Sequence, residues 1–380
     1  MSNPLCLYFG ECGGCSAQHI DYNLQLDNKK NSVINELKNN EVLVSDVKIF
    51  SDKEYFYRNR MDFVFFENGI GLRKKGFFDK IIPIKKCVIS NQRINSLLTE
   101  IWEFYEENKN QLDTFDLKRS QGTLKYATIR ASEVTDSSSI TFILNSDSTK
   151  MAQHIDLIKI FSQKTTAKNI IIGRVPAKTD ESTSFDCFEV KGELILNELI
   201  CEKKISFFSQ SFFQNNTVMA EKMINYCKEI LSKHDTKESH LIDLYGGAGT
   251  FGVCLGENFQ SVLITDIEGN NIDCARKNLE ENFMRNSRVF AADASKIKFE
   301  ENKDLFLITD PPRSGMHPKT IKQILNISPK LIIYVSCNPK QMAKELRHFL
   351  VNYKFESLAV FDLFPQTPHV EAIVELSRIN

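Results

Sequence analysis

The chain has 380 residues, of which 42% are hydrophobic and 26% are charged, and its formal net charge is −1. This length suits two or three domains, and the composition is that of an ordinary globular protein. No apolar run approaches the ~18 residues needed to cross a membrane, and the N-terminus lacks the basic and apolar regions of a secretory signal. We therefore expect a cytoplasmic protein. Its ten cysteines would then serve burial, catalysis or metal binding rather than a disulfide framework.

The first residues of the chain are rich in cysteine and glycine. Cys6, Cys12 and Cys15 follow one another in the spacing C-x5-C-G-G-C, and Cys87 offers a more distant fourth thiolate. Four cysteines can bind zinc or an iron–sulfur cluster. The spacing differs from the C-x3-C-x2-C of radical S-adenosylmethionine enzymes, which argues against that class. The residues alone leave a zinc knuckle and an iron–sulfur cluster equally open.

The N-terminal half predicts a mixed α+β domain. Residues 22–38 have many Lys, Asn and Glu among a few apolar positions, which is typical of an exposed helix. Residues 55–90 alternate and contain several glycines, which predicts hairpins. Further helices are expected over 94–108 and 151–163, and strands over 125–130, 139–144 and 169–172. We expect a cysteine segment and helix at 1–50 and a central α+β domain at 51–204.

A basic, aromatic stretch lies within this domain. Between Lys53 and Lys86 there are nine Lys or Arg against four acids, a local charge of +5, with eight Phe and Tyr among them. Cations bind phosphates and aromatic rings stack on bases, so the pattern suits RNA. A β-rich segment with solvated lysines and a phenylalanine core explains the pattern equally well.

From residue 205 onward, strands and helices alternate. Strands are expected over 241–245, 262–266, 288–293, 304–309, 330–335, 357–361 and 372–376. This alternation predicts an α/β fold with a doubly wound, mostly parallel sheet over residues 205–380.

The first of these strands ends in a glycine-rich turn, Asp243-Leu244-Tyr245-Gly246-Gly247-Ala248-Gly249. Asp266 ends the second strand, where an acid binds ribose hydroxyls in nucleotide-binding sheets. The acid just before the glycines disfavours a phosphate and suits a cationic cofactor. S-adenosylmethionine, which has an ammonium, a sulfonium and a ribose, therefore fits better than a nicotinamide dinucleotide.

Two later strands deliver reactive groups to the same sheet edge. One ends in Asp310-Pro311-Pro312-Arg313 and the other in Ser336-Cys337-Asn338-Pro339. Ligands of open α/β sheets bind at the carboxyl ends of the strands. Taken alone, Cys337 is equally well explained as a small buried hydrophobe.

The residue types separate three methylation chemistries. Amino methylation uses an aromatic residue after D-P-P, where this chain has Arg313, and RNA cytosine-C5 methylation uses a second cysteine that is missing here. Uracil-C5 methylation needs only one cysteine. Its thiolate adds to C6 and makes C5 nucleophilic, and a base then removes the C5 proton. Glu371, which begins the last strand, is the candidate base, although position alone favours a solvated acid. His369 is a second candidate, for which we prefer a structural role.

The chain resembles the RNA uracil-C5 methyltransferases, the family of bacterial 23S rRNA and tRNA ribothymidine synthases. The resemblance covers nearly the whole chain and rests on five motifs: S-Q-S-F-F-Q-N-N at 209–216, D-L-Y-G-G-A-G at 243–249, D-P-P-R-S-G at 310–315, Y-V-S-C-N-P at 334–339, and F-D-L-F-P with H-V-E at 361–371. It implies that Gln214, Tyr245, Asp266 and Asp310 bind S-adenosylmethionine, that Cys337 is the nucleophile and that Glu371 is the base. It also implies a [4Fe–4S] cluster on Cys6, Cys12, Cys15 and Cys87, with a structural or RNA-folding role.

Two departures from the family pattern bear on the substrate. Asp266 stands where the family usually has Glu, and Cys6 lies so near the start that the family's N-terminal β-barrel is expected to be absent. The chain resembles the short branch of the family that modifies 23S rRNA, although short archaeal members include tRNA enzymes. We therefore expect 23S rRNA as the substrate, with uridine 54 of tRNA as the alternative. RNA binding would then fall to residues 51–204. A non-catalytic iron–sulfur RNA-binding protein is disfavoured because Cys337 and Glu371 are both present.

Overall fold

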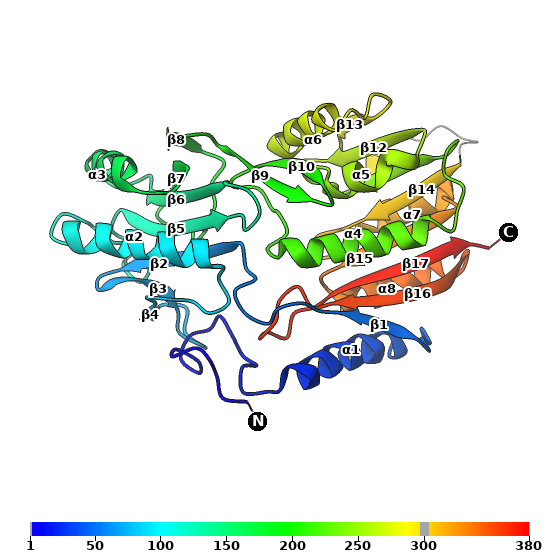
Figure 1. Cartoon of the computed structure of the whole chain (residues 1–380), viewed down its shortest axis with the longest axis horizontal. Helices are drawn as coiled ribbons and strands as arrows, with labels where there is room; N and C mark the ends of the chain where they lie inside the picture. The colour runs from blue at the N-terminus through cyan, green and yellow to red at the C-terminus, as the bar shows by residue number, and fades with distance from the viewer. Residues whose placement is uncertain (1, 297–303, 380) are drawn as a thin grey trace. The chain divides into compact units, whose positions relative to one another are not determined.

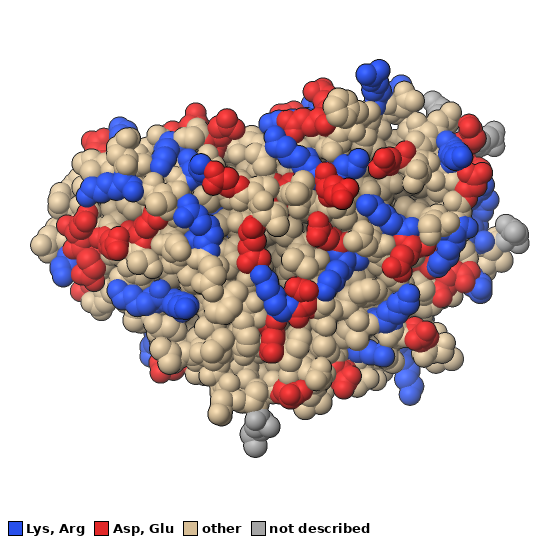
Figure 2. All heavy atoms as spheres, in the orientation of Figure 1, with Lys and Arg blue, Asp and Glu red and all other residues tan. Residues whose placement is uncertain are grey.

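The computed structural model describes residues 2–296 and 304–379 and divides into two compact units (Figure 1). Unit 1 comprises Met1–Asp21, Lys53–Glu198 and Phe208–Ser211, and unit 2 comprises Tyr22–Asp52, Leu199–Phe207 and Phe212–Asn380. On the face shown in Figure 2, acidic and basic side chains are interspersed, in keeping with the net charge of −1.

Unit 1 is built on a seven-stranded sheet. Its strands lie in the order β4 (Ile81–Pro83), β3 (Gly69–Arg73), β2 (Arg60–Phe66), β5 (Leu124–Ala131), β6 (Ser138–Asn145), β7 (Asn169–Val175) and β8 (Cys187–Lys191). Neighbours are antiparallel except β6 and β7, which are parallel because α3 (Met151–Lys164) crosses between them. Helix α3 and α2 (Gln92–Asn108) add apolar side chains to the core of the sheet. The mixed α+β architecture expected for this region is confirmed.

Unit 2 is built on an eight-stranded sheet. Its strands lie in the order β1 (Val47–Phe50), β16 (Tyr353–Phe361), β17 (Glu371–Arg378), β15 (Leu331–Ser336), β14 (Leu305–Thr309), β11 (His240–Leu244), β12 (Ser261–Asp266) and β13 (Arg288–Ala291). All neighbours are parallel except β17, which is antiparallel to β15 and β16. The strand order reverses between β11 and β14, and open α/β sheets bind their ligands at such a switch point.

Helices cover both faces of this sheet. They are α1 (Tyr22–Lys38), α4 (Thr217–Leu231), α5 (Thr250–Leu255), α6 (Gly269–Glu281), α7 (Pro318–Ile327) and α8 (Pro339–Phe349), with short 3-10 turns at Gly256–Asn258 and Ala294–Lys296. Helices α1, α7 and α8 share one apolar core with the strands, and α4 lies on the opposite face (Figure 1). The doubly wound α/β fold is confirmed. A separate two-stranded sheet joins β9 (Ile195–Ile200) and β10 (Lys203–Phe208). No described helix is long and apolar enough to span a membrane.

Helix α1 has the predicted bounds but is not the exposed helix expected from its polar composition. Its residues Gln25, Lys29, Val33 and Leu37 form a buried stripe at every fourth position. The Lys29 ammonium lies 2.5 Å from the buried Asp362 carboxylate. Burial lowers the pKa of Lys29 and the Asp362 carboxylate opposes that shift. The ion pair therefore lets a polar helix face pack against the sheet.

The structure divides the N-terminal part of the chain differently from the expected boundaries at residues 50 and 204. Residues 22–52 belong with unit 2, because β1 adds to the sheet beside β16 and α1 packs on α8. Strand β1 is only four residues long, which is too short for a periodic pattern to indicate it.

Candidate active site

The Cys337 thiol is held at the end of a buried strand. All six residues of β15 are buried, and the chain then turns at Cys337 into α8. Asn338 caps this helix by accepting a hydrogen bond from the Gln341 amide, and Pro339 occupies its first turn. Cys337 is half-buried, which leaves its sulfur accessible from one side. The predicted placement at the sheet edge is confirmed.

Strand register brings Glu371 beside this thiol. In the antiparallel pair of β15 and β17, Ser336 lies opposite Ala372. Continuing that register by one residue places Cys337 opposite Glu371, although 34 positions separate them in the sequence. The Glu371 side chain is 5% exposed, so it is not the solvated acid that its position alone favoured.

Asp310 and Arg313 complete the group from the neighbouring strand. Strand β14 pairs with β15 so that Thr309 lies opposite Tyr334, and Asp310 follows immediately. Both carboxylates, Asp310 and Glu371, interact with the Cys337 thiol, as does the exposed Arg313 guanidinium. An acid, an arginine and a thiol therefore meet at one sheet edge, as predicted, and Glu371 joins them.

Burial controls the acid–base behaviour of these groups. It raises the pKa of the Cys337 thiol to about 11, and the charges of Glu371 and Asp310 act in the same direction. The Arg313 guanidinium opposes the shift through its positive charge and a hydrogen bond to the thiol. Burial raises the pKa of Asp310 to about 7, and burial with the Asp310 charge raises that of Glu371 well above its ordinary range. A carboxylate whose pKa is raised is, once ionised, a stronger base than an ordinary carboxylate.

A buried glutamate holds the Asp310–Met316 loop against this thiol. Glu345 of α8 is 3% exposed and accepts hydrogen bonds from the Tyr334 hydroxyl at 2.5 Å and from the Met316 amide at 2.9 Å. A side chain at Gly315 would place its Cβ only 1.9 Å from the Glu345 carboxylate, so the loop approaches closely there. On the other side, the Asn338 side chain donates to the Arg313 carbonyl at 2.9 Å.

The glycine-rich turn after β11 has the backbone of a close-approach loop. Tyr245, Gly247 and Gly249 have φ angles of 61°, 54° and 83°, which lie in the left-handed region. For Tyr245, a residue with a side chain, this conformation is costly and marks a constrained site. The Gly247 amide donates to the Asp266 carboxylate at 2.9 Å, so the acid that ends β12 is turned toward the glycine turn.

Three carboxylates at the switch point fit a cationic ligand. Asp243 is buried and accepts a hydrogen bond from the Gly252 amide at 2.8 Å, while its second oxygen has no partner among the described residues. Burial raises the pKa of Asp243 to about 7, and the charges of Asp310 and Asp266 raise it further. Gln214, just before α4, donates to Asp310 at 3.5 Å. This acidic set of side chains suits the ammonium and ribose of S-adenosylmethionine and not a pyrophosphate.

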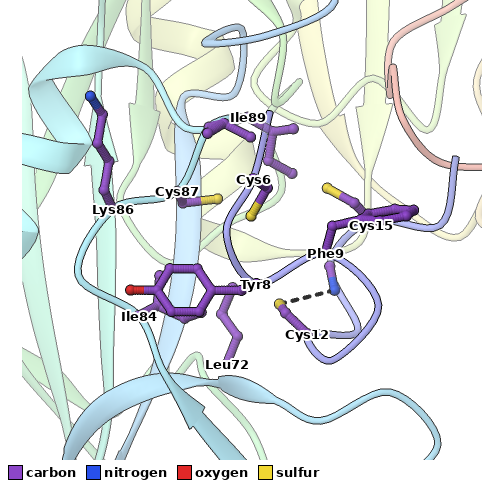
Figure 3. A pocket seen from close by; sticks show the side chains of 12 residues that line it. Cys6, Tyr8, Phe9, Cys12, Cys15, Leu72, Ile84, Lys86, Cys87 and Ile89 are labelled. Atoms are coloured by element: carbon purple, nitrogen blue, oxygen red, sulfur yellow. Dashed lines mark hydrogen bonds between the residues drawn. The ribbon is translucent and has the colours of Figure 1, made fainter. Parts of the chain in front are cut away.

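Four thiols line one pocket in unit 1. Figure 3 shows Cys6, Cys12, Cys15 and Cys87 around this pocket, three from the N-terminal loop and one from the segment before α2. The Gly14 amide donates to the Cys12 sulfur at 3.4 Å. Burial raises the pKa of Cys12 to about 11 and that of Cys15 to about 12, and the neighbouring thiols add to both shifts.

The pocket is lined by all four predicted ligands. Among the residues that the structure describes, no three Cys, His, Asp or Glu side chains are close enough to share one metal ion. The remaining cysteines do not line this pocket. We expected all of them to be buried, which is confirmed for Cys227, Cys254 and Cys274, whereas Cys187 and Cys201 are half-buried. His369 is exposed and packs against the Phe364 ring, in keeping with the structural role preferred for it.

Glu345 and Lys29 were not predicted as buried, paired residues, although the sequence pattern around each of them indicates it. Glu345 lies among Met342, Leu346 and Phe349 on the apolar stripe of α8, and Lys29 shares such a stripe with Val33 on α1. A charged residue on the buried face of an amphipathic helix needs a partner, so its position is itself an indication.

Comparison with known proteins gives a family and relatives that are all described as RNA methyltransferases. The sequence model of the family described as tRNA (Uracil-5-)-methyltransferase matches residues 21–379. The tRNA (uracil(54)-C(5))-methyltransferase of Pyrococcus furiosus is 30% identical over 98% of this chain and 85% of its own length. An uncharacterized RNA methyltransferase of Caldanaerobacter subterraneus is 31% identical over 98% of this chain and 84% of its own length.

A solved structure shows the same fold. The crystal structure of Pyrococcus abyssi tRNA (uracil-54, C5)-methyltransferase in complex with S-adenosyl-L-homocysteine matches 99% of this chain and 87% of that one, with a TM-score of 0.80 and 26% identity. The likeness extends over both units of the fold.

Proposed function

Because the chain belongs to the tRNA (uracil-5-)-methyltransferase family, we propose that it methylates C5 of uridine 54 in tRNA, with Cys337 as nucleophile and Glu371 as base. The chain is an S-adenosylmethionine-dependent RNA (uracil-C5) methyltransferase. The observation that carries the residue assignment is the β15–β17 register, which sets Cys337 opposite Glu371 beside Arg313.

The choice of tRNA revises the expectation of 23S rRNA. Three relatives with assigned substrates, all from Pyrococcus, are named as tRNA uracil-54 enzymes, and so is the solved structure. The motifs that carried the resemblance belong to the shared chemistry, and they do not distinguish one RNA from another. Short members of the family include enzymes of both kinds, so the preference for rRNA rested on the shortness of the chain alone.

In the first step the Cys337 thiol gives its proton to solvent, and Arg313 stabilises the resulting thiolate. The sulfur then bonds to C6 of the uracil, and the electron pair of the C5–C6 double bond moves toward O4. When bound, S-adenosylmethionine would supply the methyl group for C5 as an electrophile and would leave as S-adenosylhomocysteine. Glu371 then removes the C5 proton, the C5–C6 double bond reforms, and the bond from C6 to the Cys337 sulfur breaks. 5-Methyluridine is released, and the proton held by Glu371 returns the Cys337 thiolate to the thiol, so that one proton in total passes to solvent in each cycle.

The cofactor would be held at the switch point of the sheet. The open oxygen of Asp243 and the carboxylate of Asp310 would bind the ammonium of S-adenosylmethionine, and Asp266 would bind its ribose. Gln214 and Tyr245 would flank the cofactor from the segment before α4 and from the glycine turn. Asp is shorter than the Glu usual at position 266, and the hydrogen bond from Gly247 brings the turn to it.

We further propose that Cys6, Cys12, Cys15 and Cys87 bind a [4Fe–4S] cluster. In such a cluster each thiolate binds a different iron, so the four sulfurs surround the cluster and do not converge on one ion. The lining of one pocket by all four thiols supports this proposal. Anaerobically purified protein should contain about four irons and as much acid-labile sulfide. Stoichiometric zinc without sulfide would overturn the assignment.

The proposed function is tested with labelled S-adenosylmethionine and separate pools of unmodified tRNA and rRNA. We expect 5-methyluridine in the tRNA digest, and its loss when uridine 54 of the transcript is replaced by cytidine. 5-Methyluridine in 23S rRNA alone would restore the first expectation. A different methylated base would overturn the role of Cys337.

A further inference from the structure

The turn between β3 and β4 exposes two adjacent phenylalanines. We call residues 74–80 the basic turn. Within it Phe77 is 44% exposed and Phe78 is 70% exposed. Isolated exposed apolar residues are common, but two neighbouring rings on one tight turn form a surface that water solvates poorly. The two exposed rings alone do not indicate what this surface binds, so a second feature of the turn is needed.

That feature is positive charge. The basic turn contains Lys74, Lys75 and Lys80, and none of the three has an ion-pair partner among the described residues. Its one acid, Asp79, is paired with Lys118 at 2.6 Å. The turn therefore presents about three uncompensated charges on a chain whose net charge is −1.

Charge and rings are interleaved at close range. The Lys80 ammonium lies 4.4 Å from the centroid of the Phe77 ring, and the Lys74 ammonium lies 6.0 Å from it. These contacts hold the lysines beside the rings and leave Phe78 as the more exposed of the two. A ligand that fits this surface has a flat π-face and an anionic group a few ångströms away.

The cysteine segment fixes the shape of the turn. The Lys75 amide donates to the Glu11 carbonyl at 2.7 Å, and Cys12 and Lys74 form an antiparallel bridge. Within the turn, the Lys74 amide donates to the Lys80 carbonyl at 2.7 Å. The rings and lysines are thus presented by backbone held on two sides, so little conformational entropy is lost when a ligand binds.

We propose that the basic turn is an RNA-binding surface, on which Phe78 stacks on an unpaired base of the substrate and Lys75 and Lys80 contact the adjoining phosphates. This inference rests on the proposed function, because it takes the ligand to be the RNA that the enzyme methylates. Unpaired nucleotides are the ones that can expose both a base face and a phosphate to a protein. An acidic protein would satisfy the lysines but would leave the stacking face of Phe78 without a specific use.

The test compares three substitutions of one residue. Binding of an unmodified tRNA transcript is measured by fluorescence anisotropy at fixed salt, for wild type and for Phe78→Ala, Phe78→Leu and Phe78→Trp. Loss of one base stack should weaken binding about 5- to 100-fold for the Ala variant. The Leu variant should be similarly weak and the Trp variant close to wild type, because stacking needs a ring and not merely an apolar group. Phe185→Ala is the matched control, an exposed phenylalanine of the same unit beside Asp186.

The charge component is tested by salt dependence. A Lys75→Ala, Lys80→Ala double variant should reduce the slope of log affinity against log salt by about 1.4, since each contact to a single-stranded phosphate contributes about 0.7. Lys159→Ala with Lys164→Ala is the control, because these exposed lysines of α3 are already paired with Asp156 and Glu107. Affinity for S-adenosylmethionine should be unchanged in every variant.

The outcomes separate this inference from the proposed function. If wild type methylates tRNA and the Phe78 variants bind it equally well, the basic turn is not an RNA-binding surface and the proposed function stands. If Phe78→Leu binds as tightly as wild type while Phe78→Ala does not, the surface is an apolar contact and the stacking assignment is overturned. If wild type neither binds nor methylates RNA, both proposals fall.

Discussion

Cys337 and the thiols of the N-terminal pocket are alike in being withdrawn from water, but the charged groups around them differ. Burial raises the pKa of Cys337, Cys12 and Cys15 to between about 11 and about 12. Around Cys12 and Cys15, the other charged neighbours are further thiols, which make ionisation harder still. Around Cys337 the two carboxylates act in that direction too, but the Arg313 guanidinium opposes them.

The difference decides what each site can do. Positive charge added among the pocket thiols would favour their ionisation, and the proposed cluster would supply that charge. Cys337 has a cation of its own, so its thiolate can form when a substrate needs it and can be released again. In the proposed assignments, one residue type in one chain thus serves as cluster ligand in unit 1 and as reversible nucleophile in unit 2.

Cys337→Ala should have the largest effect. Without the sulfur, C5 of uracil is not activated, so methylation should fall by at least about 1,000-fold, the order of loss found on removing an enzyme's nucleophile. Affinity for S-adenosylmethionine, measured by calorimetry, should be unchanged. Cys201→Ala, which removes another half-buried thiol of unit 2, should retain full activity. Substantial turnover by Cys337→Ala would rule out the nucleophile.

Glu371→Gln should break the cycle after the methyl group is transferred. The adduct then cannot lose its C5 proton, so covalent protein–RNA should accumulate on a denaturing gel while turnover falls by about 100- to 10,000-fold. Glu375→Gln is the control, because it neutralises a buried acid on the same strand that is paired with Lys233. Absence of the adduct in Glu371→Gln would assign the proton to another base.

Cys12→Ala should affect the pocket of unit 1 that the four thiols line. We expect it to lose iron and to bind tRNA several-fold more weakly, because the loop that carries Cys12 holds the basic turn. Affinity for S-adenosylmethionine, which binds in unit 2, should stay at the wild-type value. Cys187→Ala, a half-buried thiol of unit 1 outside the pocket, should leave both iron content and RNA affinity intact.

Arg313→Ala should have the smallest of these effects and the most diagnostic one. The guanidinium lowers the pKa of the Cys337 thiol, so its removal raises that pKa and reduces the thiolate fraction at any pH below it. The wild-type rate should rise with pH above 7, and the variant profile should lie at higher pH. The rate at neutral pH should fall about tenfold for each unit of added shift. Arg313→Lys, which keeps the charge, should lie between them, and coincident profiles would show that the cation does not act on the thiol.

The sequence indicated the local parts of this enzyme with considerable accuracy. Helix Tyr22–Lys38 has the expected bounds, and β14 and β15 end within one residue of the positions expected from their apolar runs. Such runs indicate where a strand stops and a turn begins, because burial and turn chemistry are properties of neighbouring residues. Cys337 was found for that reason, and its motif gave it a role.

Only the tertiary structure decided which of these parts meet. The motifs paired Glu371 with Cys337 as base and nucleophile but did not show how the two are brought together, which depends on the antiparallel register of two strands far apart in the chain. Nor did the pattern reveal that Lys29 pairs with Asp362, or that residues 22–52 join the second sheet. The local pattern of a segment fixes its conformation and its apolar face. The partner of that face is chosen by the packing of the whole chain, where burial and the pairing of buried charges are satisfied together.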